Sequence, residues 1–238
     1  DGSAGVGANT LSIDTGDMGK LTFVGGSSTS VIGAWDDLTP TANEEAHGVA
    51  YAGTPAGAAN GAASTHNIFI YDYTVMDGVA LKAGYTPSAG ATAVEGSVEY
   101  GVHYTGIDGL DVYAAMGENN NQPTSGITGK ADLTAFAAVY TMGAISVGYQ
   151  VNETDSGSAN EDEDFTAMGI SYAVSDDLSI SYGEREYNSG DKTLDQEDEA
   201  ISISYTMGGM TIAGGFNSSD NVAGASATTA DKESYEIG

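Results

Sequence analysis

Residues 168–182 read MGISYAVSDDLSISY. Large apolar residues alternate with glycine or serine on both sides of the polar turn at 175–177. A period of two residues is typical of a β-strand whose two faces meet different surroundings. Because only a short Ser-Asp-Asp turn separates the two runs, the stretch predicts an antiparallel hairpin.

The same unit recurs at intervals of about 31 to 36 residues, which marks an internal repeat. We expect hairpins over 68–85, 98–114, 136–149, 168–182 and 201–214. Each has a tyrosine just before its turn: Tyr73, Tyr104, Tyr140, Tyr172 and Tyr205. Longer polar connections follow the hairpins, at 88–96, 118–132, 152–164, 186–198 and 218–232. Short turns on one side and long connections on the other predict an up-and-down antiparallel meander.

The two faces of this meander differ in kind. One is aliphatic, and the other is small or polar and carries Lys82, Glu99, His103 and Asp111. A soluble barrel would place the apolar face inside. The inverse arrangement is favoured here, because a glycine- and serine-rich face is too small for a packed core and suits a wide, wet lumen. Tyrosines at one end of every repeat also match the aromatic girdle of a membrane interface. The alternative explanation is that these tyrosines only reflect the general preference of tyrosine for β-strands.

The composition restricts the function. The 238 residues include 34 Asp and Glu against 6 Lys and Arg, a formal net charge of −28, which argues against binding nucleic acid. There is no cysteine for disulfides or thiolate metal sites, and only three histidines are present. No apolar run approaches the roughly 18 residues of a spanning helix. Since the chain begins at Asp1 without a signal segment, we expect a mature chain or a fragment.

The first quarter of the chain has a different pattern. Residues 10–25 predict one more tight hairpin, and residues 26–66 then show little alternation. This second stretch contains the only tryptophan, Trp35. Loops this long without periodicity are uncommon and usually functional.

The order of these features resembles the general bacterial porins of the outer membrane, and most closely their alphaproteobacterial type. The resemblance is carried by GKLTF at 19–23, WDDLTPTA at 35–42, the hairpins that end in tyrosine, and ESYEIG at 233–238. It covers essentially the whole chain. It implies an all-β, transmembrane, antiparallel up-and-down β-barrel of the 16-stranded type, with about 13 strands present as one partial domain over 1–238. The first three strands and the end of the last would be missing.

The resemblance also implies a site. In such porins the loop corresponding to 26–66 folds into the barrel as a constriction loop, so Asp36, Asp37, Glu44 and Glu45 are candidates for the acidic side of the constriction. Fixed charges in a narrow passage bias ion permeation. The alternative is a solvated acidic loop. The expected function is a water-filled outer-membrane channel for small hydrophilic solutes and ions, with a preference for cations. The resemblance implies a homotrimer in contact with outer-membrane lipid and lipopolysaccharide.

Other functions are weaker readings. Glu99 and His103 share a face, but no serine stands in a distinctive setting for a nucleophile, so no enzyme is expected. No cofactor is expected either, although calcium could bind the acidic runs 161–164 and 195–199, which otherwise read as solvated loops. The competing class is a secreted or surface acidic β-rich structural protein or adhesin.

Overall fold

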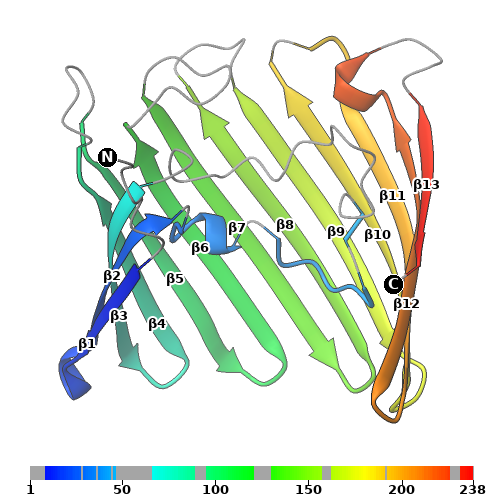
Figure 1. The fold of residues 1–238 in the computed structure, drawn as a ribbon, viewed down its shortest axis with the longest axis horizontal. Coiled ribbons are helices and arrows are strands. Elements are labelled where there is room, and N and C mark those ends of the chain that lie inside the picture. Colours follow the sequence, from blue (N-terminus) through cyan, green and yellow to red (C-terminus); the bar gives the residue numbers. More distant parts are fainter. Residues whose placement is uncertain are drawn as a thin grey trace, which may run out of the picture.

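The described residues of the chain form one antiparallel sheet of 13 strands that follow one another in sequence order (Figure 1). The computed structural model describes residues 9–27, 29–35, 37–43, 45–46, 66–88, 95–120, 130–156, 162–190, 192–225 and 231–237. The strands are β1 (Asn9–Asp14), β2 (Lys20–Ser27), β3 (His66–Met76), β4 (Val79–Thr86), β5 (Ser97–Ile107), β6 (Leu110–Asn119), β7 (Ala131–Met142), β8 (Ile145–Asp155), β9 (Glu163–Ala173), β10 (Leu178–Ser189), β11 (Gln196–Met207), β12 (Met210–Asp220) and β13 (Lys232–Ile237). The predicted all-β meander of about 13 strands is confirmed.

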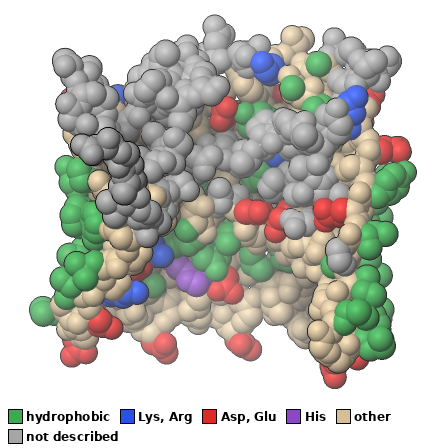
Figure 2. Space-filling view, viewed as in Figure 1, with side chains coloured by type: hydrophobic (Ala, Val, Ile, Leu, Met, Phe, Trp, Pro, Cys, Tyr) green, Lys and Arg blue, Asp and Glu red, His purple; other side chains and the backbone are tan. Residues whose placement is uncertain are grey.

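The alternation of the sequence becomes an inside-out distribution of side chains. On β11, Ile201 and Ile203 are 58 % and 47 % exposed on the outer face, whereas Ser202 between them is 2 % exposed on the inner face. Buried polar side chains recur along the concave face, for example Gln150 and Asn217. Figure 2 shows the hydrophobic side chains along both flanks of the molecule, where the outer face comes into view. This is the pattern of a barrel with apolar surroundings outside and a polar interior.

The short turns all lie at one end of the sheet, and the longer connections lie at the other (Figure 1). A two-residue hairpin turn of type I′ or II′ needs a residue with positive φ, and Gly109 supplies it between β5 and β6 with a φ of 73°. The five repeat tyrosines lie on the outer face close to these turns. Tyr140, Tyr172 and Tyr205 are exposed there, and Tyr73 and Tyr104 are half-buried.

The strands extend beyond the predicted hairpins at the end opposite the turns. β8 continues to Asp155 and β11 begins at Gln196, so residues expected in polar connections belong to strands. Both faces are polar here, which removes the contrast that marks a strand in the sequence. Likewise, β2 runs to Ser27 and β3 starts at His66, so the expected 26–66 loop is shorter at both ends.

The sheet remains open along its two edge strands. Within the described residues, β1 pairs only with β2 and β13 only with β12. None of the helices in this part of the chain has the length and apolar character to cross a membrane.

Candidate functional site

Between β2 and β3, the described residues 29–46 cross the concave face of the sheet, apart from the undescribed positions 36 and 44 (Figure 1). These described parts, 29–35, 37–43 and 45–46, are called the inner loop below. Successive wall side chains bind its backbone. Gln150 on β8 accepts a hydrogen bond from Leu38 N at 2.7 Å, Ser181 on β10 accepts one from Ala42 N at 2.8 Å, and Asn217 on β12 donates one to Ala46 O at 2.5 Å. The inner loop therefore lies against the wall from strand to strand.

The first turn of the inner loop is held by Glu99 of β5. Its Oε2 accepts hydrogen bonds from Ser30 Oγ at 2.9 Å, from Ile32 N at 3.1 Å and from Val31 N. Ser30 Oγ in turn accepts a hydrogen bond from Gly33 N at 3.0 Å, at the start of the short helix η2 (Gly33–Trp35). Glu99 is only 1 % exposed. It lies on the inner face, but its carboxylate contacts the inner loop and not the open lumen.

The four predicted constriction acids are only partly described. Asp37 is exposed and Glu45 is half-buried, whereas Asp36 and Glu44 lie outside the described residues. Burial first, and then the charge of Asp37, raises the pKa of Glu45 to about 7. Two interacting carboxyl groups thus belong to the inner loop, and one of them changes its charge near neutral pH.

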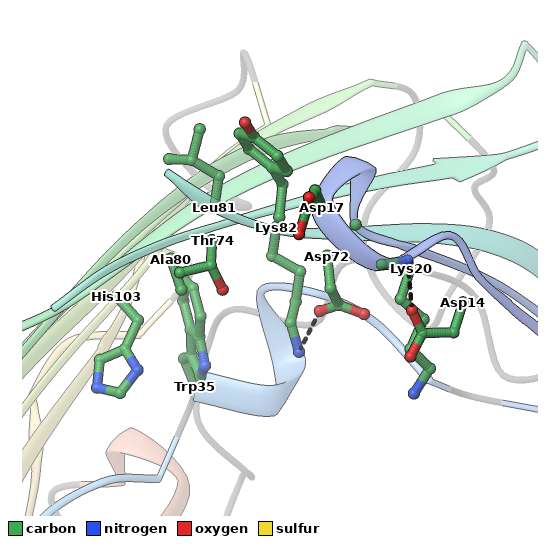
Figure 3. Close-up of a pocket in the computed structure, with 13 residues that line it drawn as sticks. Asp14, Asp17, Lys20, Trp35, Asp72, Thr74, Ala80, Leu81, Lys82 and His103 are labelled. Atoms are coloured by element: carbon green, nitrogen blue, oxygen red, sulfur yellow. Dashed lines mark hydrogen bonds and ion pairs between the residues drawn. The ribbon is translucent and has the colours of Figure 1, made fainter. Parts of the chain in front are cut away.

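The turn side of the inner wall holds mixed charges. A cavity of about 640 Å³ is lined by residues from β1 to β5 and by the inner loop, among them Lys20, Trp35, Asp72, Lys82 and His103. Figure 3 shows Lys82 reaching toward Asp72, with 3.4 Å between Nζ and Oδ1. Lys20 lies opposite Asp72 in the sheet register, so lysines flank this aspartate on both sides. The wall therefore offers accessible cations as well as carboxylates.

Two further predicted wall residues contact each other. His103 Nε2 lies 2.8 Å from Asp111 Oδ1, and the His103 ring stacks on Tyr113 with 4.1 Å between the ring centroids. The partner of His103 is thus Asp111, whereas Glu99, which the sequence places on the same face, binds the inner loop. The arrangement is a polar stretch of wall with its side chains fixed by one another.

Sequence reasoning missed the single arginine of the chain. Arg185 of β10 is 3 % exposed on the inner face, and its Nε donates to Asp198 Oδ2 at 2.7 Å. The guanidinium lies 5.8 Å from the ring centroid of Phe165 and 5.9 Å from that of Tyr187. A sequence signal existed, because Arg185 lies four residues after Ser181, so both side chains point to the same face of the strand, the face of the serines that alternate with Ile180.

Part of the small-residue face has a different environment from the one expected. The sequence suggested that glycines and serines border a wide, wet lumen. In the structure, the inner loop covers Gly148 and Gly169 and forms a hydrogen bond with Ser181.

In the described part of the chain no group of three or more His, Asp or Glu side chains could hold a metal ion. Residue 161 of the first acidic run lies outside the described residues.

The fold defines a class, that of bacterial outer-membrane β-barrels with an inward-folded loop. A family model described as "Gram-negative porin" matches residues 1–221. The chain therefore belongs to the Gram-negative porin family and is an outer-membrane channel protein. Membership of this family decides against the adhesin alternative. No curated protein sequence matches the chain.

Solved structures of bacterial outer-membrane proteins and porins share the fold. In vitro folded OmpT, an outer membrane protein of Vibrio cholerae, aligns with a TM-score of 0.61 at 18 % identity over 97 % of this chain and 78 % of that chain. An anion-selective porin from Comamonas acidovorans aligns with a TM-score of 0.64 at 12 % identity over 89 % and 66 %. The outer membrane channel DcaP of Acinetobacter baumannii aligns with a TM-score of 0.57 at 10 % identity over 92 % and 71 %.

Proposed function

We propose that the protein is a passive diffusion channel for small hydrophilic solutes and ions, not an enzyme, and that the inner loop narrows its passage. The observation that carries this proposal is the attachment of the inner loop to the concave wall. Its backbone is bonded at Glu99, Gln150, Ser181 and Asn217, which lie on strands β5 to β12. A loop held across a polar interior restricts solutes by size and by charge, and needs no stereospecific binding site.

The proposed channel prefers cations. Asp37 and Glu45 stand on the inner loop, and Asp72 and Asp111 stand on the wall, whereas the lysines near them are Lys20 and Lys82. Asp36 and Glu44 complete the proposed acidic side of the constriction. The single arginine is buried against Asp198, so its charge is largely neutralised. The Comamonas acidovorans porin is anion-selective, so a shared fold leaves the sign of the preference to the side chains.

The outer surface supports two further proposals about assembly. Tyr73, Tyr104, Tyr140, Tyr172 and Tyr205 form an aromatic girdle at the interface on the turn side, in contact with outer-membrane lipid. The assembly is a homotrimer, and one Vibrio cholerae OmpT structure is described as a trimer form. Crosslinking in mild detergent should stop at three subunits. A monomeric mass would contradict the trimer and leave the channel proposal standing.

Planar-bilayer recording tests the function. We expect stepwise, near-ohmic conductance, and a reversal potential across a potassium chloride gradient that favours potassium. Asp37→Asn should weaken this preference, because it removes an exposed carboxylate of the inner loop. Glu153→Gln, on the outer face of β8, is the matched control and should leave the reversal potential unchanged. Absence of conductance steps would refute the channel, and a chloride preference would refute the proposed selectivity alone.

A further inference from the structure

Glycines of the inner wall lie directly beneath the inner loop. A Cβ atom at Gly169 on β9 would stand 2.8 Å from the carbonyl oxygen of Pro40 and 3.0 Å from Cβ of Thr39. A Cβ atom at Gly84 on β4 would stand 2.9 Å from Cγ2 of Val31. Non-bonded carbon atoms normally settle at about 3.5–4.0 Å. The inner loop is thus packed on backbone at positions where any side chain would lift it.

The rings of Trp35 and Pro40 in the inner loop meet two more of these glycines. A Cβ atom at Gly101 on β5 would overlap the indole of Trp35, and one at Gly148 on β8 would overlap the ring of Pro40. Trp35 is 9 % exposed and packs with Ile32 against the wall residues Ala115 and Leu133. Large groups on the loop therefore match missing side chains on the wall.

Buried polar side chains bind the backbone of the loop, and two of them, Glu99 and Gln150, lie two residues from the glycines Gly101 and Gly148 on the same face of their strands. Gln150 accepts a hydrogen bond from Leu38 N and also donates one to Trp35 O at 3.1 Å. Gln150 is fully buried, and Asn217, which donates to Ala46 O, is 1 % exposed. Because the bonds go to main-chain atoms, they fix the path of the loop and not the identity of its side chains.

The wall residues beneath the inner loop are called the loop track below: Gly84, Gly101, Gly148 and Gly169 together with Glu99, Gln150, Ser181 and Asn217. We propose that the loop track sets the distance between the inner loop and the wall, and thereby the width of the passage. The proposal rests on the proposed function, in which the inner loop narrows the channel. The residues of the loop track lie on the wall beneath the inner loop and do not face the open passage. The proposal gives them the role of positioning the constriction.

Alanine substitutions at the glycines test whether the wall sets the distance between the inner loop and the sheet. Gly148→Ala and Gly169→Ala should displace the inner loop toward the axis, so the single-channel conductance should fall and the largest polyethylene glycol that enters should become smaller. Gly183→Ala is the matched control on the same face, because its Cβ would meet Ala46 Cβ at an ordinary 3.5 Å. Gly209→Ala, whose Cβ has no heavy-atom neighbour within 4 Å in the described structure, is a second control. Both controls should conduct like the unmodified protein.

A variant without added bulk keeps the proposal testable if the alanine variants fail to fold. Gln150→Ala removes two backbone bonds of the loop, so we expect greater open-channel current noise. Ser204→Ala, on the inner face of β11, is its control. Folded Gly148→Ala and Gly169→Ala proteins with unchanged conductance and size limit would overturn the proposal, and so would unchanged noise in Gln150→Ala. Failure of the unmodified protein to conduct would instead refute the proposed function.

Discussion

Arg185 donates from Nε to Asp198 Oδ2 at 2.7 Å, and both side chains are buried in the inner wall, at 3 % and 1 % exposure. Gln196 donates to the same carboxylate at 3.2 Å, and the rings of Phe165 and Tyr187 flank the guanidinium. A buried ion pair is costly to break, because the remaining charge loses both its partner and its water.

Asp198→Ala should therefore lower the free energy of unfolding by about 3–5 kcal/mol, measured by denaturant titration in lipid vesicles. Replacing both partners, as Arg185→Met with Asp198→Leu, should recover much of this loss because no unpaired charge remains. Lys130→Gln breaks the exposed pair between Lys130 Nζ and Glu95 Oε2 at 2.6 Å and serves as the control, with no expected change. Equal effects of Asp198→Ala and Lys130→Gln would contradict the buried-pair assignment.

The cation preference should depend on pH through Glu45. Its pKa is raised to about 7 by burial and by Asp37, so it is neutral below that pH and negatively charged above it. The potassium preference should accordingly grow as the pH rises through about 7. Reversal potentials measured on both sides of this pH test the prediction. In Glu45→Gln the step should disappear, and a step that persists in this variant would assign it to another group.

The only tryptophan of the chain reports on the packing of the inner loop against the wall. Trp35 is 9 % exposed, lies 5.5 Å from Tyr113 between ring centroids and rests on Gly101. In the folded protein, acrylamide should quench its fluorescence weakly. Gly101→Ala should increase the quenching, because a Cβ there overlaps the indole, whereas Gly209→Ala should not. Quenching of the unmodified protein as strong as that of the unfolded chain would contradict the seated position.

Hairpins were predictable from the sequence wherever the two faces contrast strongly. Ile170 and Ser171 show this contrast, and they lie in a strand with the predicted orientation. The contrast is lost where polar residues occupy both faces, as at Asn152 and Glu153, so the strands were predicted too short at that end.

Loop attachments could not be predicted, because they join residues far apart in the chain. Glu99 and Ile32 are 67 positions apart, and Asn217 and Ala46 are 171 positions apart. No local pattern encodes such pairs. Gly148 shows the same difficulty, since a glycine that faces a wet lumen and one that lies under a loop look alike in a single sequence.

The most direct measurement is a disulfide between the inner loop and the wall. The chain contains no cysteine, and a Cβ at Gly183 would lie 3.5 Å from Cβ of Ala46, within the usual Cβ–Cβ range of about 3.5–4.5 Å for a disulfide. Ala46→Cys with Gly183→Cys should crosslink on oxidation in the folded protein, and the oxidised channel should conduct in steps of unmodified size. Ala46→Cys with Gly209→Cys should not crosslink. Failure of the first pair to crosslink, or an oxidised protein that does not conduct, would contradict an open channel with its inner loop bound to the wall.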